Sequence, residues 1–178
     1  MNEEIAFTKV NLPYGWLGNM SPYPVEYKGK HYRTTEALFQ CMHFENYPQV
    51  QEEIMAQTSP MAAKKVSKNY QHLLAKDRNN MNDMEERLAI RTECMRLCLT
   101  LKLDQHIELK EALLLTDDAI IIEDSSNRPN ESGLLWGAAL QNGEWVGQNL
   151  LGRLWMEQRD KLKKENISIV SSPLFNLF

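Results

Sequence analysis

Residues 33–40, RTTEALFQ, decide how the N-terminal half of this chain folds. Thr34 and Thr35 are residue types that cap helix N-termini, so we expect a helix from here to about Phe44. Its apolar side chains form a broad face, which predicts burial: Leu38, Phe39, Cys41 and Met42. One carboxylate, Glu36, lies in the first turn. It is either only an acid favoured by the partial positive charge of a helix start, or a group that performs chemistry.

The segments around this helix predict further short elements. Residues 25–32, VEYKGKHY, read as a hairpin with its turn at Lys28, Gly29 and Lys30. We expect further helices at about 48–56, from Pro60 after a Ser59 cap, at 81–103, at 107–115, and from 147 or 149 to 164. The second half of the 81–103 helix is apolar nearly all round, which predicts a central, buried helix. Residues 119–124, AIIIED, predict a buried strand, 125–133 a polar loop, 141–145 a turn, and about 166–178 a C-terminal tail.

Length and composition predict one domain over residues 1–178, of the α+β class, predominantly helical with a small β-sheet. The chain has 178 residues, of which 43% are hydrophobic and 25% charged, as in ordinary globular proteins. Its net charge of -4 is atypical of a protein that binds bulk nucleic acid, although a local basic pocket for one nucleotide is compatible with it.

Targeting and metal-binding patterns are missing from the sequence. The first ten residues do not resemble a secretory signal, and no apolar run is long enough to cross a bilayer, so we expect no membrane association. The three cysteines favour a reducing, cytoplasmic location, with Cys94 and Cys98 as small buried side chains. The four histidines form no metal-ligand pattern, so we expect neither a metal nor a cofactor.

Two N-terminal clusters could bind a ligand. The loop 14–24, YGWLGNMSPYP, combines Trp16, Gly18 and Asn19, and could present backbone N–H groups and an amide to a polar ligand. It could equally be a structured loop whose aromatic residues plug the core. Lys64 and Lys68, with Lys65 between them, follow a helix start and form either a solvated face or a phosphate site.

A C-terminal cluster lies in residues 134–159. Trp136, Gly137, Gly147 and Asn149 precede or open the last predicted helix, where glycines admit a ligand close to the backbone and tryptophan can stack. The spacing is not G-x-G-x-x-G after a strand, so it does not predict a dinucleotide-binding fold of the Rossmann type.

Taken in order, these motifs resemble those of the NADAR family, also called YbiA-like, from about residue 14 to 160. The first is a W-x-x-N-x-x-P loop at Trp16, Asn19 and Pro22, and the second is Y-x-T-x-E at Tyr32, Thr34 and Glu36, with Gln40 one turn on. The C-terminal motif comprises Trp136, Gly137, Gly147, Asn149, Leu151, Gly152, Met156 and Arg159.

The resemblance implies an enzyme that hydrolyses the N-glycosidic bond of a ribosylated base or nucleotide, with Glu36 as the catalytic carboxylate. Family members are linked to ribosylaminopyrimidines of riboflavin synthesis, or to ADP-ribose on guanine, free or within nucleic acid. The residues expected to bind substrate are Trp16, Gly18, Asn19, Gln40, Lys64, Lys68, Trp136, Gly137, Gly147 and Asn149. Two alternatives remain: a module that binds ADP-ribose or NAD without turnover, and a purely structural role for Glu36.

The sequence departs from the family pattern at two positions. His43 stands where members often have lysine, and Gly133 stands three residues before Trp136, where members often have aspartate. If that aspartate does chemical work, the work here falls to another acid or to none. The candidates are Glu123, Asp124 and Glu131.

Overall fold

The structure is a computed structural model that describes residues 3–77 and 84–170. The chain divides into two compact units, which we describe separately. Unit 1 comprises Met1–Thr8, Leu12–Tyr14 and His106–Phe178, and unit 2 comprises Lys9–Asn11 and Gly15–Gln105. One domain over residues 1–178 therefore stays a prediction.

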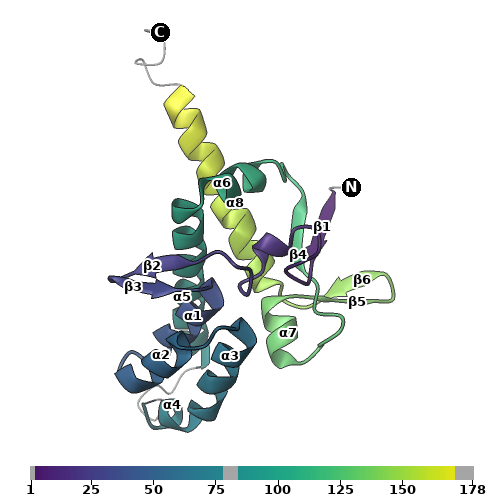
Figure 1. The fold of residues 1–178 in the computed structure, drawn as a ribbon. Coiled ribbons are helices and arrows are strands. Elements are labelled where there is room, and N and C mark those ends of the chain that lie inside the picture. Colours follow the sequence, from purple (N-terminus) through teal and green to yellow (C-terminus); the bar gives the residue numbers. More distant parts are fainter. Residues whose placement is uncertain (1–2, 78–83, 171–178) are drawn as a thin grey trace. The chain divides into compact units, whose positions relative to one another are not determined.

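Unit 2 is mainly helical and carries one hairpin (Figure 1). Its elements are the 3-10 helix η1 (Gly15–Leu17), the strands β2 (Val25–Tyr27) and β3 (Lys30–Tyr32), and the helices α1 (Thr35–Met42), α2 (Pro48–Met55), α3 (Pro60–Asn69), α4 (Gln71–Asp77) and α5 (Met84–Gln105). Helix α1 packs against α2, α3 and α5, and so forms the centre of this unit. The buried side chains of its core include Leu38, Phe39, Phe44, Ile54 and Leu99.

Local sequence chemistry explains the predicted elements of unit 2. The antiparallel strands β2 and β3 meet at Lys28 and Gly29, whose φ angles of 50° and 71° are the two left-handed positions of a tight hairpin turn. The Thr34 hydroxyl caps α1 by accepting a hydrogen bond from Ala37 N at 3.2 Å. Ser59 caps α3 in the same way, with Pro60 in its first turn. The predicted hairpin, caps and helices are confirmed here, whereas α4 was not predicted.

Helix α5 differs from the expectation that it is buried all round. Its buried residues follow the 3-and-4 spacing of one face: Met95, Cys98, Leu99, Lys102 and Leu103. Leu97 and Leu101 on other sides are only half-buried. The helix is therefore buried along one stripe, and that stripe contains a lysine. The start predicted at residue 81 lies outside the described residues.

Unit 1 combines two small sheets with three helices. Its elements are the strands β1 (Glu4–Phe7), β4 (Ile120–Glu123), β5 (Ala139–Gln141) and β6 (Glu144–Val146), and the helices α6 (Ile107–Leu114), α7 (Glu131–Trp136) and α8 (Leu150–Val170). Strand β4 pairs in parallel with β1, so Ile5 stands opposite Ile121. The sequence predicted β4 but not β1, because only the distant partner makes the first residues a strand.

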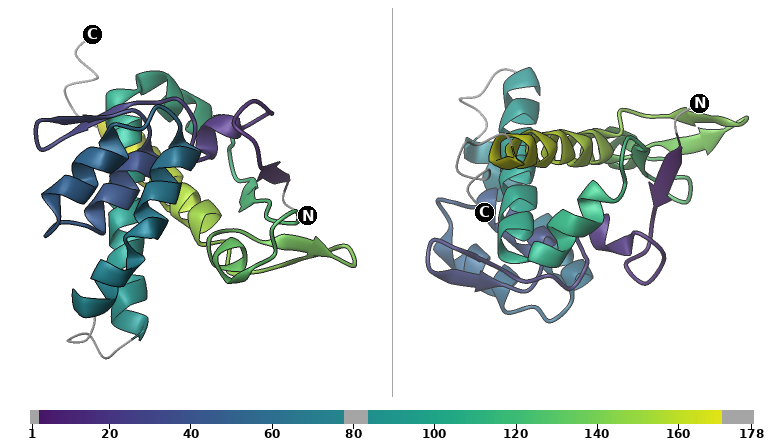
Figure 2. Two further views of the ribbon diagram at one scale, coloured as in Figure 1. Left: turned by 60° about the horizontal axis from the view of Figure 1, so that its bottom comes forward. Right: turned by 90° about the horizontal axis from the view of Figure 1, so that it is seen from above.

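The segment before α8 is more ordered than predicted. Asn130 caps α7 by accepting a hydrogen bond from Gly133 N at 2.9 Å, so the predicted loop 125–133 already ends in helix. The predicted turn at 141–145 is confirmed as the link between β5 and β6, and Figure 2 shows this hairpin extending away from the start of α8.

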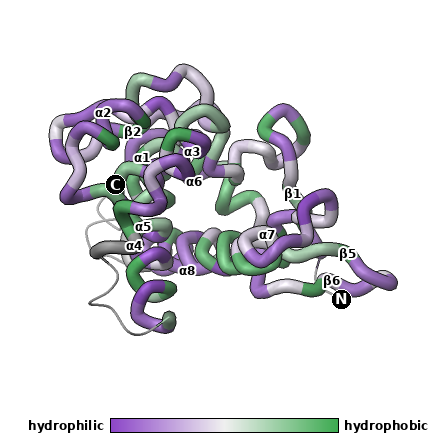
Figure 3. Tube along the Cα trace, turned by 90° about the horizontal axis from the view of Figure 1, so that it is seen from below, coloured by the Kyte–Doolittle hydropathy of each residue, from purple (hydrophilic) through white to green (hydrophobic). Residues whose placement is uncertain are grey.

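Helix α8 packs against β4, α6 and α7. Hydrophobic and hydrophilic residues alternate along it in Figure 3, as in a helix buried on one side. It continues to Val170, so the first part of the predicted tail is helical, and residues 171–178 lie outside the described residues.

The predicted fold class, α+β and predominantly helical, is confirmed. Within residues 3–77 and 84–170 the strands form three separate two-stranded sheets rather than one. None of the helices in that part of the chain combines the length and apolar character needed to cross a membrane.

Candidate functional site

Glu36 is a nearly buried carboxylate in the first turn of α1, with its side chain 8% exposed. Its Oε1 atom accepts a hydrogen bond from Gln40 Nε2 at 2.9 Å and lies 3.8 Å from Lys64 Nζ. Both contacts are made to Oε1, so among the described residues Oε2 is the oxygen left for a ligand or a water. The structure thus brings together three of the predicted site residues and orients the carboxylate.

The predicted loop around Asn19 lies against the same helix start. Asn19 O accepts the Glu36 backbone N–H at 3.0 Å, and Asn19 Oδ1 accepts the Thr35 hydroxyl at 3.0 Å. Asn19 Nδ2 contacts Met95 Sδ at 2.9 Å, a weak acceptor. Asn19 therefore positions the first turn of α1, and its predicted contact with substrate stays a prediction.

Lys102 is a residue of this region that sequence reasoning missed. It is fully buried, and its ammonium group donates to Trp16 O, to Gly18 O at 3.1 Å and to Ser21 Oγ at 2.7 Å. Burial lowers its pKa from 10.5 to about 7. The buried amine of Lys102 thus fixes the position of the loop around Asn19, which contacts Glu36. The signal was present as one lysine within the apolar run LCLTLKL, where a charge needs an internal partner.

The lysine cluster is only partly assembled around Glu36. Lys64 is half-buried and contacts Glu36, whereas Lys68, one turn further along α3, is exposed, as is Lys65. His43, which replaces the family's lysine, turns back along α1, with Nδ1 2.6 Å from Phe39 O. Binding of substrate by Lys64 and Lys68 stays a prediction.

In unit 1 the glycines of the C-terminal motif allow the chain to pack closely on β4. A side-chain carbon at Gly137 would lie 2.2 Å from Glu123 O, and one at Gly152 would lie 2.1 Å from Ile121 O. Gly147 has a φ of 148°, and a side-chain carbon there would meet Gly137 O at 2.5 Å. The glycine spacing therefore has a structural cause that does not require a ligand.

Asn149 also stabilises this packing, because its side chain makes the hydrogen bonds to β4 that a neighbouring strand would make. Its Oδ1 accepts Glu123 N at 3.0 Å, and its Nδ2 donates to Ile121 O at 2.8 Å, on the backbone of β4. Gly147 and Asn149 also line a cavity of about 460 Å³ in unit 1, together with Trp145 and Glu4. Trp136 is 9% exposed and belongs to the core of the same unit.

The three acids that could replace the family's aspartate differ in their surroundings. Glu123 is 13% exposed at the end of β4 and forms an ion pair with Arg128. Asp124 accepts Ser126 N at 2.8 Å and so stabilises a turn, while Glu131 is exposed in the first turn of α7. At Gly133 itself a side-chain carbon would lie 2.2 Å from Arg128 O, so this backbone does not accommodate aspartate.

The described residues contain no group of three His, Cys, Asp or Glu side chains arranged to hold a metal ion. Of the three cysteines, Cys41 and Cys98 are buried and Cys94 is half-buried. Their expected role as small buried side chains is therefore confirmed for Cys98 and only partly for Cys94.

The NADAR domain family matches residues 6–163, which covers most of both units. The chain belongs to the NADAR family. N-glycosidase YbiA from Shigella boydii serotype 4 (strain Sb227) is 33% identical over 163 residues, which span 90% of this chain and 89% of that protein. N-glycosidase Npun_R5314 from Nostoc punctiforme is 26% identical over 161 residues, which span 89% and 92% of the two chains.

A solved structure of similar sequence has the same fold. The NMR structure of the Escherichia coli protein YbiA matches with a TM-score of 0.72 and 28% sequence identity, and covers 93% of this chain and 88% of the other. The predicted resemblance is therefore confirmed. The predicted residues of this NADAR protein form two groups, one around Glu36 in unit 2 and one beside β4 in unit 1.

Proposed function

We propose that this NADAR protein is an N-glycosidase that hydrolyses the bond between ribose C1′ and a base or amine nitrogen. The observation that carries the proposal is the Glu36 carboxylate, nearly buried, with Oε1 bound by Gln40 and Lys64. Its relatives are named N-glycosidases, which agrees with a carboxylate-centred hydrolysis.

Glu36 can assist hydrolysis in two ways. As the C1′–N bond breaks, the electron pair leaves with nitrogen and positive charge develops on the sugar, which a nearby carboxylate stabilises. The carboxylate can also accept a proton from the water that attacks C1′ and pass it to the departing nitrogen, so that one water supplies both the hydroxyl on C1′ and the hydrogen on nitrogen. Fixing Oε1 through Gln40 and Lys64 leaves Oε2 for either task, and positioned acid–base groups contribute about 10² to 10⁴ in rate.

The substrate we propose is a ribosylated base or nucleotide, either an ADP-ribosylated guanine or a ribosylaminopyrimidine phosphate. The cationic Lys64 and the more exposed Lys68 suit its phosphate groups, and Trp16 suits stacking on a base. Binding of substrate by Trp136, Gly137, Gly147 and Asn149 of unit 1 stays a prediction. The hydrogen bonds from the Asn149 side chain to β4 also give this residue a structural role.

If a second acid takes part, we infer that it is Glu123. Unlike Asp124 and Glu131, it is both nearly buried and ion-paired. Replacing Glu123 with glutamine should then lower kcat, whereas the same change at the exposed Glu131 should not. Equal activity of both variants would exclude a chemical role for Glu123.

The test of the proposed function is a turnover assay that separates released base by chromatography. Wild-type protein should release base from at least one of three substrates: ADP-ribosylated guanine, ribosylaminopyrimidine phosphate or NAD. Glu36→Gln should lose about 10²- to 10⁴-fold in rate. Glu108→Gln is the matched control, because Glu108 also lies in the first turn of a helix but is 61% exposed. Undiminished turnover by Glu36→Gln would contradict the proposal and favour a structural role.

The second candidate is a module that binds ADP-ribose or NAD without turnover. It is favoured by Gly133, because the backbone there has no room for the acid that relatives of this family often carry. Tight binding of ADP-ribose in calorimetry, together with no release of base by wild-type protein, would support this candidate over the enzyme.

A further inference from the structure

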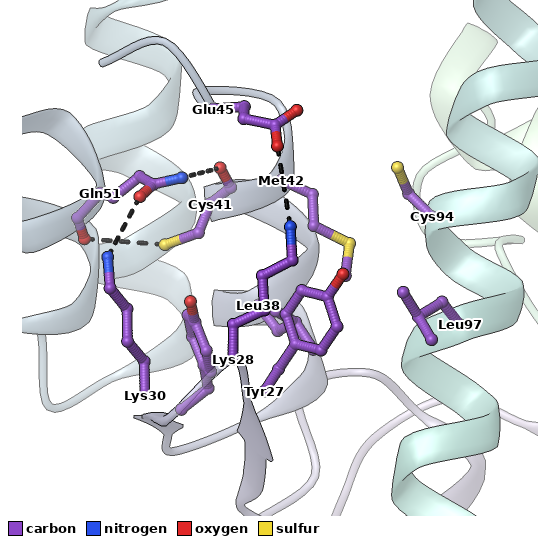
Figure 4. A pocket seen from close by; sticks show the side chains of 11 residues that line it. Tyr27, Lys28, Lys30, Leu38, Cys41, Met42, Glu45, Gln51, Cys94 and Leu97 are labelled. Atoms are coloured by element: carbon purple, nitrogen blue, oxygen red, sulfur yellow. Dashed lines mark hydrogen bonds and ion pairs between the residues drawn. The ribbon is translucent and has the colours of Figure 1, made fainter. Parts of the chain in front are cut away.

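Unit 2 contains a cavity on a different side of α1 from Glu36. It has a volume of about 280 Å³ and lies between the β2–β3 hairpin, α1 and α5 (Figure 4). At about 100° per residue, Leu38 in its wall points away from Glu36 on the opposite side of α1. The cavity is therefore separate from the proposed catalytic carboxylate.

The inner wall of this cavity is apolar and polarisable. Leu38 and Met42 of α1 face Cys94 and Leu97 of α5 across the opening, and the Tyr27 ring lies beside them (Figure 4). Thioether and thiol sulfur atoms and an aromatic ring pack well against a flat ring. The wall thus suits the face of an aromatic group.

The mouth of the cavity is cationic. Lys28 and Lys30 of the hairpin both line the cavity, where the Lys28 amine lies beside Glu45 and the Lys30 amine lies beside Gln51 (Figure 4). Tyr32 and Cys41 add no negative charge at neutral pH, since their ordinary pKa values lie above 7 and burial raises the pKa of each to about 12. The lining of the cavity thus holds two cations and one anion.

Both lysines are held by contacts that an anionic ligand can replace. Lys28 Nζ lies 3.7 Å from Glu45 Oε1, with the two side chains 68% and 80% exposed, and such pairs contribute little. Lys30 Nζ donates to Gln51 Oε1 at 3.4 Å, a long hydrogen bond. The Lys28 and Lys30 amines therefore make only weak contacts within the protein.

We propose that this cavity binds a small aromatic anion, with its ring between α1 and α5 and its carboxylate or phosphate at Lys28 and Lys30. The volume sets the size of the ligand. Ligand pockets usually measure about 300 to 1,000 Å³, so this one suits one ring system with one anionic group and is too small for a dinucleotide. The site is thus distinct in ligand class from any that holds ADP-ribose or NAD.

The experiment uses the full chain and phenyl phosphate as the probe, with benzyl alcohol and inorganic phosphate as its neutral and ring-free counterparts. Binding is measured by calorimetry and by protection of Cys94 from N-ethylmaleimide, followed by mass spectrometry. Cys94 is the half-buried cysteine, whereas Cys41 and Cys98 are buried. Phenyl phosphate should bind and slow alkylation of Cys94, and each counterpart should bind at least tenfold more weakly.

Two variants test the two halves of the site. Lys28→Gln with Lys30→Gln should weaken binding about tenfold by removing the charges, and Leu97→Trp should abolish it by filling the cavity. Lys161→Gln is the matched control, because Lys161 also forms an exposed ion pair, with Glu157. Equal affinity of the double variant and the control, or no protection of Cys94 by bound probe, would overturn the proposal, as would absence of binding at millimolar concentration.

Discussion

Replacing Lys102 with methionine should change how the stability of this NADAR protein depends on pH. Burial lowers the Lys102 pKa to about 7 in the folded state, against an ordinary value of 10.5. Between these two pH values the unfolded chain holds the proton and the folded protein does not. The unfolded state therefore binds more protons, and the free energy of unfolding rises with pH in this window.

The magnitude follows from the size of the shift. Each pKa unit corresponds to about 1.4 kcal/mol, so the Lys102 contribution should grow by about 4 kcal/mol between pH 7 and pH 10. Methionine has a similar length and no ionisable group. The difference in unfolding free energy, wild type minus Lys102→Met, should therefore increase with pH by about that amount.

The assay is urea unfolding of both proteins at pH 7, 8, 9 and 10. The absolute difference in unfolding free energy at any one pH has a second source, because methionine removes one hydrogen-bond donor from Trp16 O, Gly18 O and Ser21 Oγ. Each lost hydrogen bond costs about 1 kcal/mol, since Ser21 still donates to Trp16 O and Gly18 O. Ser21→Ala is the control, since it removes one acceptor but keeps the amine, and its difference from wild type should stay flat with pH.

A difference between wild type and Lys102→Met that does not vary with pH would refute this reasoning. It would mean that Lys102 keeps its proton when folded, because hydrogen bonds from the ammonium group to three oxygens outweigh the cost of burying the charge. The loop around Asn19 would then be held by a permanent cation.

Three further substitutions test the packing described above, each by urea unfolding. Thr34→Ala should cost about 1 kcal/mol by removing the N-cap of α1, and Thr34→Ser should restore most of it. Gly137→Ala should cost about 1 to 3 kcal/mol, because the new carbon meets Glu123 O on the backbone of β4. Arg159→Met should cost about 1.5 to 3 kcal/mol, because the buried guanidinium donates to Ala119 O at 2.9 Å and to the Thr116 hydroxyl at 2.8 Å; an unchanged midpoint of urea unfolding would contradict this.

Features of the chain that depend on neighbouring residues were predictable from sequence. The caps at Thr34 and Ser59 and the hairpin turn at Lys28 and Gly29 form where predicted, because each needs only a hydroxyl or a permissive φ angle within a few residues. Glu36 was identified as a first-turn acid for the same reason. The motif order was also sufficient to predict the NADAR family.

Features that depend on distant partners required the tertiary structure. Strand β1 forms because β4, more than 100 residues later, supplies its hydrogen-bonding edge. The glycine at 137 suggested a ligand site, but its position is explained by the backbone carbonyl of Glu123 in β4, which no local pattern reveals.

The amino-acid sequence was thus sufficient for the family, for most helix starts, and for Glu36 with Gln40 one turn along the same helix. The other groups around the carboxylate followed only from the folded chain: Lys64 from α3, and the loop held by Lys102 from α5. The physical reason is that capping and turn energies act over three or four residues, whereas a buried charge is stabilised by groups brought from elsewhere in the chain.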